Sequence, residues 1–115
     1  MARNQKITLK SIPAKGGSGS DTATVLSLQG ELTIDYAVQL RDFLLENLNK
    51  QKAFALKVNN VESIDITGIQ LIQRFYWDAK EMGKPTTIEL KLSEEQRQLL
   101  EKTGFSEFIN LSAKQ

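Results

Sequence analysis

Short β-like runs alternate with amphipathic helical segments along the chain, and this order constrains the fold most. Strands are predicted at residues 5–12 (QKITLKSI), 23–29 (ATVLSLQ), 53–58 (AFALKV) and 86–92 (TTIELKL). Residues 33–51, 67–82 and 93–104 repeat apolar residues at three- and four-residue steps, which indicates helices. Helical crossovers make the later strands parallel, whereas the first two form an antiparallel hairpin. The predicted fold is a mixed α/β sheet with packed helices.

The ends of the predicted elements carry their own signals. Pro13 makes residues 5–12 an edge strand, and the nearly continuous apolar run at 53–58 suits a central strand covered on both faces. Thr33 or Asp35 can cap the first helix, and Ser93 with Gln96 can cap the third. The segment GKP stops the second helix, and SEFINL adds a last helical turn. Residues 14–21 (AKGGSGSD) read as a flexible hairpin loop, without the Gly-Lys-Ser/Thr ending of a phosphate-binding loop.

Length and composition exclude several classes of protein. A chain of 115 residues is one domain, 1–115, with a short tail at 112–115. The net charge of +1 provides no general attraction to nucleic acid or to anionic lipid. Cysteine and histidine are absent, which removes disulfides, thiolate chemistry, imidazole bases and their metal sites, and no cofactor or metal is expected. No apolar stretch has the length of a signal or membrane span, so we expect a cytoplasmic protein without direct membrane insertion.

The junction VESIDITG, residues 61–68, joins a strand to a helix at the carboxyl end of a predicted parallel strand. Functional sites of α/β proteins often lie at the carboxyl ends of parallel strands. Asp65 and Thr67 are both good N-cap residues, so either can have a purely structural role, and Gly68 can serve only to let helix and strand approach. Glu31 reads as a solvated or cap-like carboxylate, because no second acid or base is tied to it by spacing.

Three motifs resemble the STAS domain of bacterial anti-sigma factor antagonists over about residues 5–111. They are Gly30-Glu31-Leu32 before the first helix, Asp65 to Gly68 before the second, and Leu99-Leu100 with Thr103-Gly104-Phe105 before Ile109. The resemblance implies a STAS-like fold and a protein partner, a kinase-type anti-sigma factor. In that family the stretch matching Asp65 to Gly68 is usually Asp-Ser-Ser-Gly, and the kinase phosphorylates the first Ser. A phosphate there switches the interface, since it adds about 1.5 to 2 negative charges.

The sequence departs from the family at the decisive position. Ile66 stands where the phosphoacceptor Ser stands and cannot accept phosphate, so Thr67 is the phosphorylation candidate. Thr33 stands where the family often has Asp, and the chain stops at SAKQ, where relatives commonly continue into another helix. An exposed Ile66 would imitate the unmodified state, and we therefore favour a constitutive binder.

Trp77 falls nearly opposite the apolar stripe of the second helix, beside Gln70, Arg74 and Glu81. An exposed Trp is typical of protein interfaces, although another element of the fold can also cover it. Together with the junction, this helix face defines the predicted partner-binding residues: Asp65, Ile66, Thr67, Gly68, Gln70, Arg74 and Trp77.

Three functions are therefore considered. The first is a non-enzymatic interaction module that binds a kinase-type anti-sigma factor or related regulator in bacterial partner switching, a form of transcription regulation. The second is a cytoplasmic accessory subunit of a lipid or anion transport ATPase, because stand-alone STAS domains also resemble such proteins. The third, a small nucleotide-binding protein or enzyme using Asp65, Thr67 and Glu31, is disfavoured because no histidine, cysteine or phosphate loop supports it.

Overall fold

A four-stranded sheet in the order β1-β2-β3-β4 forms the centre of the protein. In the computed structural model, which describes residues 6–13 and 23–113, the strands are β1 (Ile7–Ile12), β2 (Thr24–Leu32), β3 (Phe54–Ile64) and β4 (Thr86–Leu90). β1 pairs antiparallel with β2, and β2–β3 and β3–β4 are parallel pairs. The predicted hairpin, parallel strands and edge position of β1 are confirmed. The loop predicted at 14–21 lies outside the described residues.

The helices are α1 (Ala37–Lys50), α2 (Ile66–Glu81), α3 (Glu94–Leu100) and α4 (Ser106–Ala113). A short turn of 3-10 helix, Ile34–Tyr36, leads into α1, and a wide turn at Glu101–Phe105 joins α3 to α4. The predicted last turn at SEFINL is thus a helix of its own, and the expected tail starts later than residue 112 because α4 continues to Ala113. Ser93 and Gln96 form the predicted capping box of α3.

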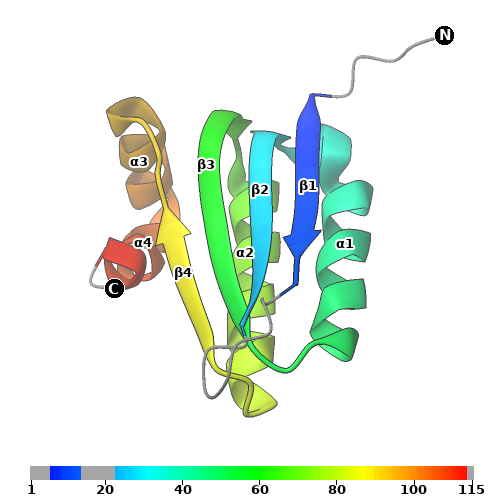
Figure 1. Cartoon of the computed structure of the whole chain (residues 1–115). Helices are drawn as coiled ribbons and strands as arrows, with labels where there is room; N and C mark the ends of the chain where they lie inside the picture. The colour runs from blue at the N-terminus through cyan, green and yellow to red at the C-terminus, as the bar shows by residue number, and fades with distance from the viewer. Residues whose placement is uncertain (1–5, 14–22, 114–115) are drawn as a thin grey trace, which may run out of the picture.

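One face of the sheet carries the core, and α1 and α2 pack on that face (Figure 1). Phe54, Leu56 and Val58 of β3 are each 1% exposed, as an interior strand requires. The aromatic rings of Phe54 and Phe75 meet edge to face with centroids 4.9 Å apart, and those of Tyr76 and Phe108 do so at 5.7 Å. The second contact ties α4 to α2, so the C-terminal helix is part of the core.

The expectation that β3 is covered on both faces is wrong. Its side chains alternate between buried and accessible, with Lys57 exposed, because the helices occupy one side of the sheet only. Glu89 of β4 lies across from Lys57, and its carboxylate accepts a hydrogen bond from the Lys57 ammonium at 3.1 Å. Lys57 first and Lys91 second hold the pKa of Glu89 below its ordinary value. The uncovered face is therefore polar where β3 and β4 meet.

Candidate functional site

Asp65, the residue between β3 and α2, holds two segments of the chain together. Its Oδ1 accepts a hydrogen bond from the Gly68 N–H at 2.9 Å, which caps α2. Its Oδ2 accepts a second from the Ile34 N–H at 3.0 Å, at the start of the turn before α1. The two alternatives for the α2 cap are thus resolved in favour of Asp65, and its carboxylate serves two helix starts at once.

The first helix is not capped as the sequence suggests. The N-cap residues of the turn Ile34–Tyr36 and of α1, Thr33 and Tyr36, form no capping bond with their own side chains, and the Thr33 Oγ1 is buried without a hydrogen-bond partner among the described residues. Asp35 is exposed. The expected caps, Thr33 or Asp35, are wrong because Asp65, at the end of the neighbouring strand β3, accepts the hydrogen bond from the Ile34 N–H.

Gly68 lies beneath the surface rather than on it. It is buried, and a Cβ built on it would lie 1.9 Å from the carbonyl oxygen of Leu32, at the end of β2. This confirms the structural interpretation of Gly68, since only a residue without a side chain lets α2 approach β2 so closely. Gly68, predicted as a partner-binding residue, is therefore covered by its own fold.

The outward face of α2 carries four of the predicted partner-binding residues in one strip: Ile66, Gln70, Arg74 and Trp77. Ile66 is 45% exposed and Trp77 is 48% exposed, so the predicted exposure of Trp77 is confirmed. Gln70 and Arg74 are exposed between them, and Arg74 forms an ion pair with Asp78 at 3.1 Å. At about 1.5 Å per residue the strip from Ile66 to Trp77 is about 16 Å long.

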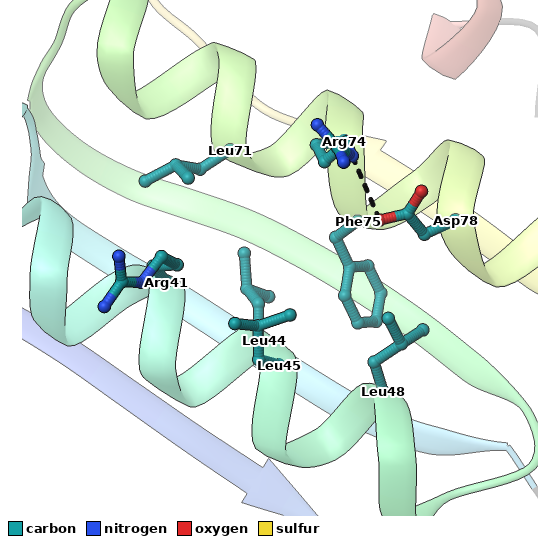
Figure 2. A pocket seen from close by; sticks show the side chains of 8 residues that line it. All are labelled: Arg41, Leu44, Leu45, Leu48, Leu71, Arg74, Phe75 and Asp78. Carbon is teal, nitrogen blue, oxygen red and sulfur yellow. Dashed lines mark hydrogen bonds and ion pairs between the residues drawn. The ribbon is translucent and has the colours of Figure 1, made fainter.

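A shallow apolar groove runs between α1 and α2, and Figure 2 shows Arg74 at its edge. From α1 it is lined by Arg41, Leu44, Leu45 and Leu48, and from α2 by Leu71, Arg74, Phe75 and Asp78. Leu45 is 46% exposed, whereas Leu44 and Leu48 belong to the core. The groove therefore continues the exposed strip of α2 towards α1.

A second hollow, at the N-terminus of α2, includes residues that the sequence did not single out for binding. Ile34 and Leu99 are 66% and 52% exposed, and with Ile66 and Thr67 they line a space whose walls also include Leu100 and Thr103. No local pattern singles out Leu99, because neighbouring helix residues lie about 100° apart and both members of the pair Leu99-Leu100 fit an apolar stripe of that width. That Ile34 and Leu99 meet Ile66 follows from the tertiary fold.

The Asp65 carboxylate at this junction is committed to the backbone. Each of its oxygens accepts a hydrogen bond from a backbone N–H, which gives Asp65 a structural role. Among residues 6–13 and 23–113 no three Asp, Glu, His or Cys side chains cluster as metal ligands would. None of the helices within those ranges is both long and apolar enough to cross a membrane.

Comparisons with known proteins place the chain in a family. The mixed sheet and strand-to-helix junction define the class of small α/β domains with the SpoIIAA-like fold. The sequence matches the family described as "Mlab, STAS domain" over residues 17–111, and the chain belongs to this STAS domain family. No curated protein matches the chain significantly.

Two solved structures show the same fold. The anti-sigma factor antagonist SpoIIAA in its unphosphorylated form matches with a TM-score of 0.59 and 15% identity, over 84% of this chain and 81% of the other. The Bacillus cell fate determinant SpoIIAA in the phosphorylated form matches with a TM-score of 0.56 and 15% identity, over 86% of each chain. At such identity the likeness concerns the fold.

Proposed function

We propose that the chain is a non-enzymatic, cytoplasmic interaction module that binds a kinase-type anti-sigma factor or related regulator, and that it binds constitutively. The observation that carries the proposal is Ile66, an apolar side chain 45% exposed at the position that resembles the family's phosphoacceptor. Exposed apolar side chains on a rigid helix start add contact area to a partner surface. The Asp65 bonds hold that surface in one conformation without any modification.

A second candidate is an accessory subunit of a lipid or anion transport ATPase. Two observations favour it: the match to the family described as "Mlab, STAS domain", and the absence of a Ser at position 66. A permanent subunit has no need of a phosphate switch, whereas partner switching depends on one. Copurification distinguishes the two, because tagged full-length protein should bring down either a kinase-like regulator or an ATPase subunit. Recovery of neither would contradict both.

Phosphate should not regulate the wild-type protein. Thr67 is the only hydroxyl left in the motif, and it does not cap α2. It is half-buried and lies about 100° around the helix from Ile66, so it does not take the place of the family's phosphoacceptor. Incubation with the copurified kinase and ATP should leave the intact mass unchanged, whereas Ile66→Ser should gain one phosphate. Stoichiometric phosphate on Thr67 that abolishes binding would overturn constitutive binding.

Trp77→Ala should weaken binding of the copurified partner by about 2 kcal/mol, roughly 30-fold, because a half-exposed Trp on the strip is a typical interface anchor. The free energy of unfolding should fall by less than about 1 kcal/mol, since the substitution removes an edge-to-face packing with the Tyr76 ring but no fully buried side chain. Calorimetric titration and urea unfolding measure the two quantities. Met82→Ala is the matched control, since Met82 is 50% exposed but lies at the C-terminal end of α2, outside the strip. A large drop in stability with binding intact would show that Trp77 serves the fold alone.

A further inference from the structure

Three exposed apolar side chains from separate parts of the chain gather at the N-terminus of α2. Ile34, Ile66 and Leu99 line the hollow there, and we call them the apolar triad. Of the polar residues beside them, Asp65 and Thr103 are occupied within the protein, and the half-buried Thr67 adds one hydroxyl. Asp65 caps two helix starts, and the Thr103 hydroxyl lies 3.1 Å and 3.0 Å from the carbonyl oxygens of Leu99 and Leu100. The hollow therefore offers an incoming group mainly apolar contact.

The surroundings of the triad are acidic. Leu99 also lines an adjoining hollow with Glu62, Ser63, Ile64, Ser93, Glu95 and Gln96. Neither Glu62 nor Glu95 forms an ion pair with a described residue, and no Lys or Arg is among the residues that line either hollow. We call Glu62 and Glu95 the rim. The two segments that carry them are joined, because the Gln96 side chain takes part in the capping box and donates a hydrogen bond to the Val61 carbonyl at 3.0 Å. Two solvated carboxylates thus stand beside an apolar contact point.

This combination discriminates between possible occupants. A second copy of the chain that docked through the same patch would bring Glu62 and Glu95 close to their own counterparts, which is unfavourable. A lipid surface with anionic headgroups would be repelled by the same carboxylates. A protein segment with an apolar side chain flanked by Lys or Arg complements both the triad and the rim.

We propose that the partner of this module inserts an apolar side chain among Ile34, Ile66 and Leu99 from a segment whose Lys or Arg side chains face Glu62 and Glu95. The inference deepens the proposed binding function, on which it rests, by naming the chemistry of the partner. Apolar contact supplies affinity that salt does not weaken, while the carboxylates steer the encounter in a salt-dependent way. Replacing the triad and replacing the rim should therefore have different salt dependences.

The test uses the full chain, labelled with ¹⁵N, and three synthetic peptides as probes. The first carries a leucine pair flanked by Lys and Arg, the second has Glu in place of every Lys and Arg, and the third has Ser in place of the leucines. Amide shifts on titration to about 1 mM, at about 50 mM and about 300 mM salt, give the site and the affinity. The basic apolar peptide should shift the amides around Ile66 and Leu99, and the other two should bind at least about 10-fold more weakly.

Variants separate the two parts of the site. Leu99→Ser should weaken the basic peptide about 10-fold at both salt concentrations, whereas Glu62→Gln with Glu95→Gln should weaken it mainly at low salt. The matched controls are Met82→Ser for exposed apolar area and Glu81→Gln with Glu107→Gln for charge, and neither should change binding. No shift with the basic peptide, equal binding of the acidic peptide, or shifts centred on the groove between α1 and α2 would overturn the inference.

The same variants tell this inference from the binding function itself. If the copurified partner binds the wild-type chain and both rim and triad variants equally, the module binds proteins by another surface and only the inference fails. If no partner copurifies, the binding function fails, while the peptide titration still decides whether the triad and its rim accept a basic apolar segment.

Discussion

Gly68→Ala should lower the free energy of unfolding by about 3 kcal/mol, a large effect for a single methyl group. The added Cβ would lie 1.9 Å from the carbonyl oxygen of Leu32 and 2.7 Å from its carbonyl carbon, far inside van der Waals contact. Both atoms belong to the backbone of β2, so no side-chain rotation relieves the clash. The first turn of α2 must move away from the sheet, which also lengthens the bond from the Gly68 N–H to Asp65.

Urea unfolding measures this effect, and Gly83→Ala is the control for a glycine replaced at the opposite end of α2, just after the helix ends. Gly83 has open space around its Cβ position but a φ of +75°, so its substitution should cost about 1 kcal/mol from backbone strain alone. If Gly68→Ala were no worse than Gly83→Ala, the close approach of α2 to β2 would be refuted. The exposed strip on α2 would then lose the support that fixes its position.

The order and type of the elements could be predicted because local patterns determine them. Apolar residues at helical spacing, the capping box at Ser93 and Gln96 and the stop at GKP are all signals within a few residues. β3 is longer than predicted, since it continues from Val58 to Ile64 through the polar residues Asn59, Asn60 and Glu62. Pairing with β2 extends it, because Val61, Ser63 and Ile64 lie opposite Gly30, Glu31 and Leu32.

One residue of β3, Lys57, already indicates that helices cover only one face of the sheet. Lys57 interrupts the apolar run of AFALKV and lies on the uncovered face of the sheet, so the strand alternates like one with a single buried face. Its charge forms an ion pair with Glu89 on the neighbouring strand β4, a partner that only the strand register reveals. The prediction of two covered faces counted Ala55 as a core residue, but Ala55 lies on the uncovered face and is only half-buried.

The candidate site was predictable only in part. Exposure of Trp77, Gln70 and Arg74 follows from helical periodicity, which local sequence contains. The meeting of Ile34, Ile66 and Leu99 joins segments separated by more than thirty positions, and no pattern within one element encodes it. The hydrogen bond between Asp65 and Ile34 could not be predicted from local sequence either, since it spans 31 positions.

Asp65→Ala should lower the free energy of unfolding by about 2 kcal/mol, because it removes the acceptor of two backbone N–H groups at two helix starts. Removing one N-cap bond costs about 1 kcal/mol on average, and the Asp65 carboxylate forms such a bond to each of the two segments. Asp35→Ala is the control: Asp35 is an exposed carboxylate near the same turn, it provides no cap, and its replacement should change stability by less than about 0.5 kcal/mol.

Asp65→Asn tests whether one side chain truly serves both segments. Its amide keeps one oxygen acceptor, but the NH₂ group must face the second N–H, so it should destabilise the fold about half as much as Asp65→Ala does. Amide shifts should then change at either Ile34 or Gly68, whereas Asp65→Ala should change both. A wild-type stability for both variants would show that the two bonds contribute nothing. If instead both bonds break, Ile34 is no longer held beside Ile66, and binding at the apolar triad should weaken even though no triad residue was replaced.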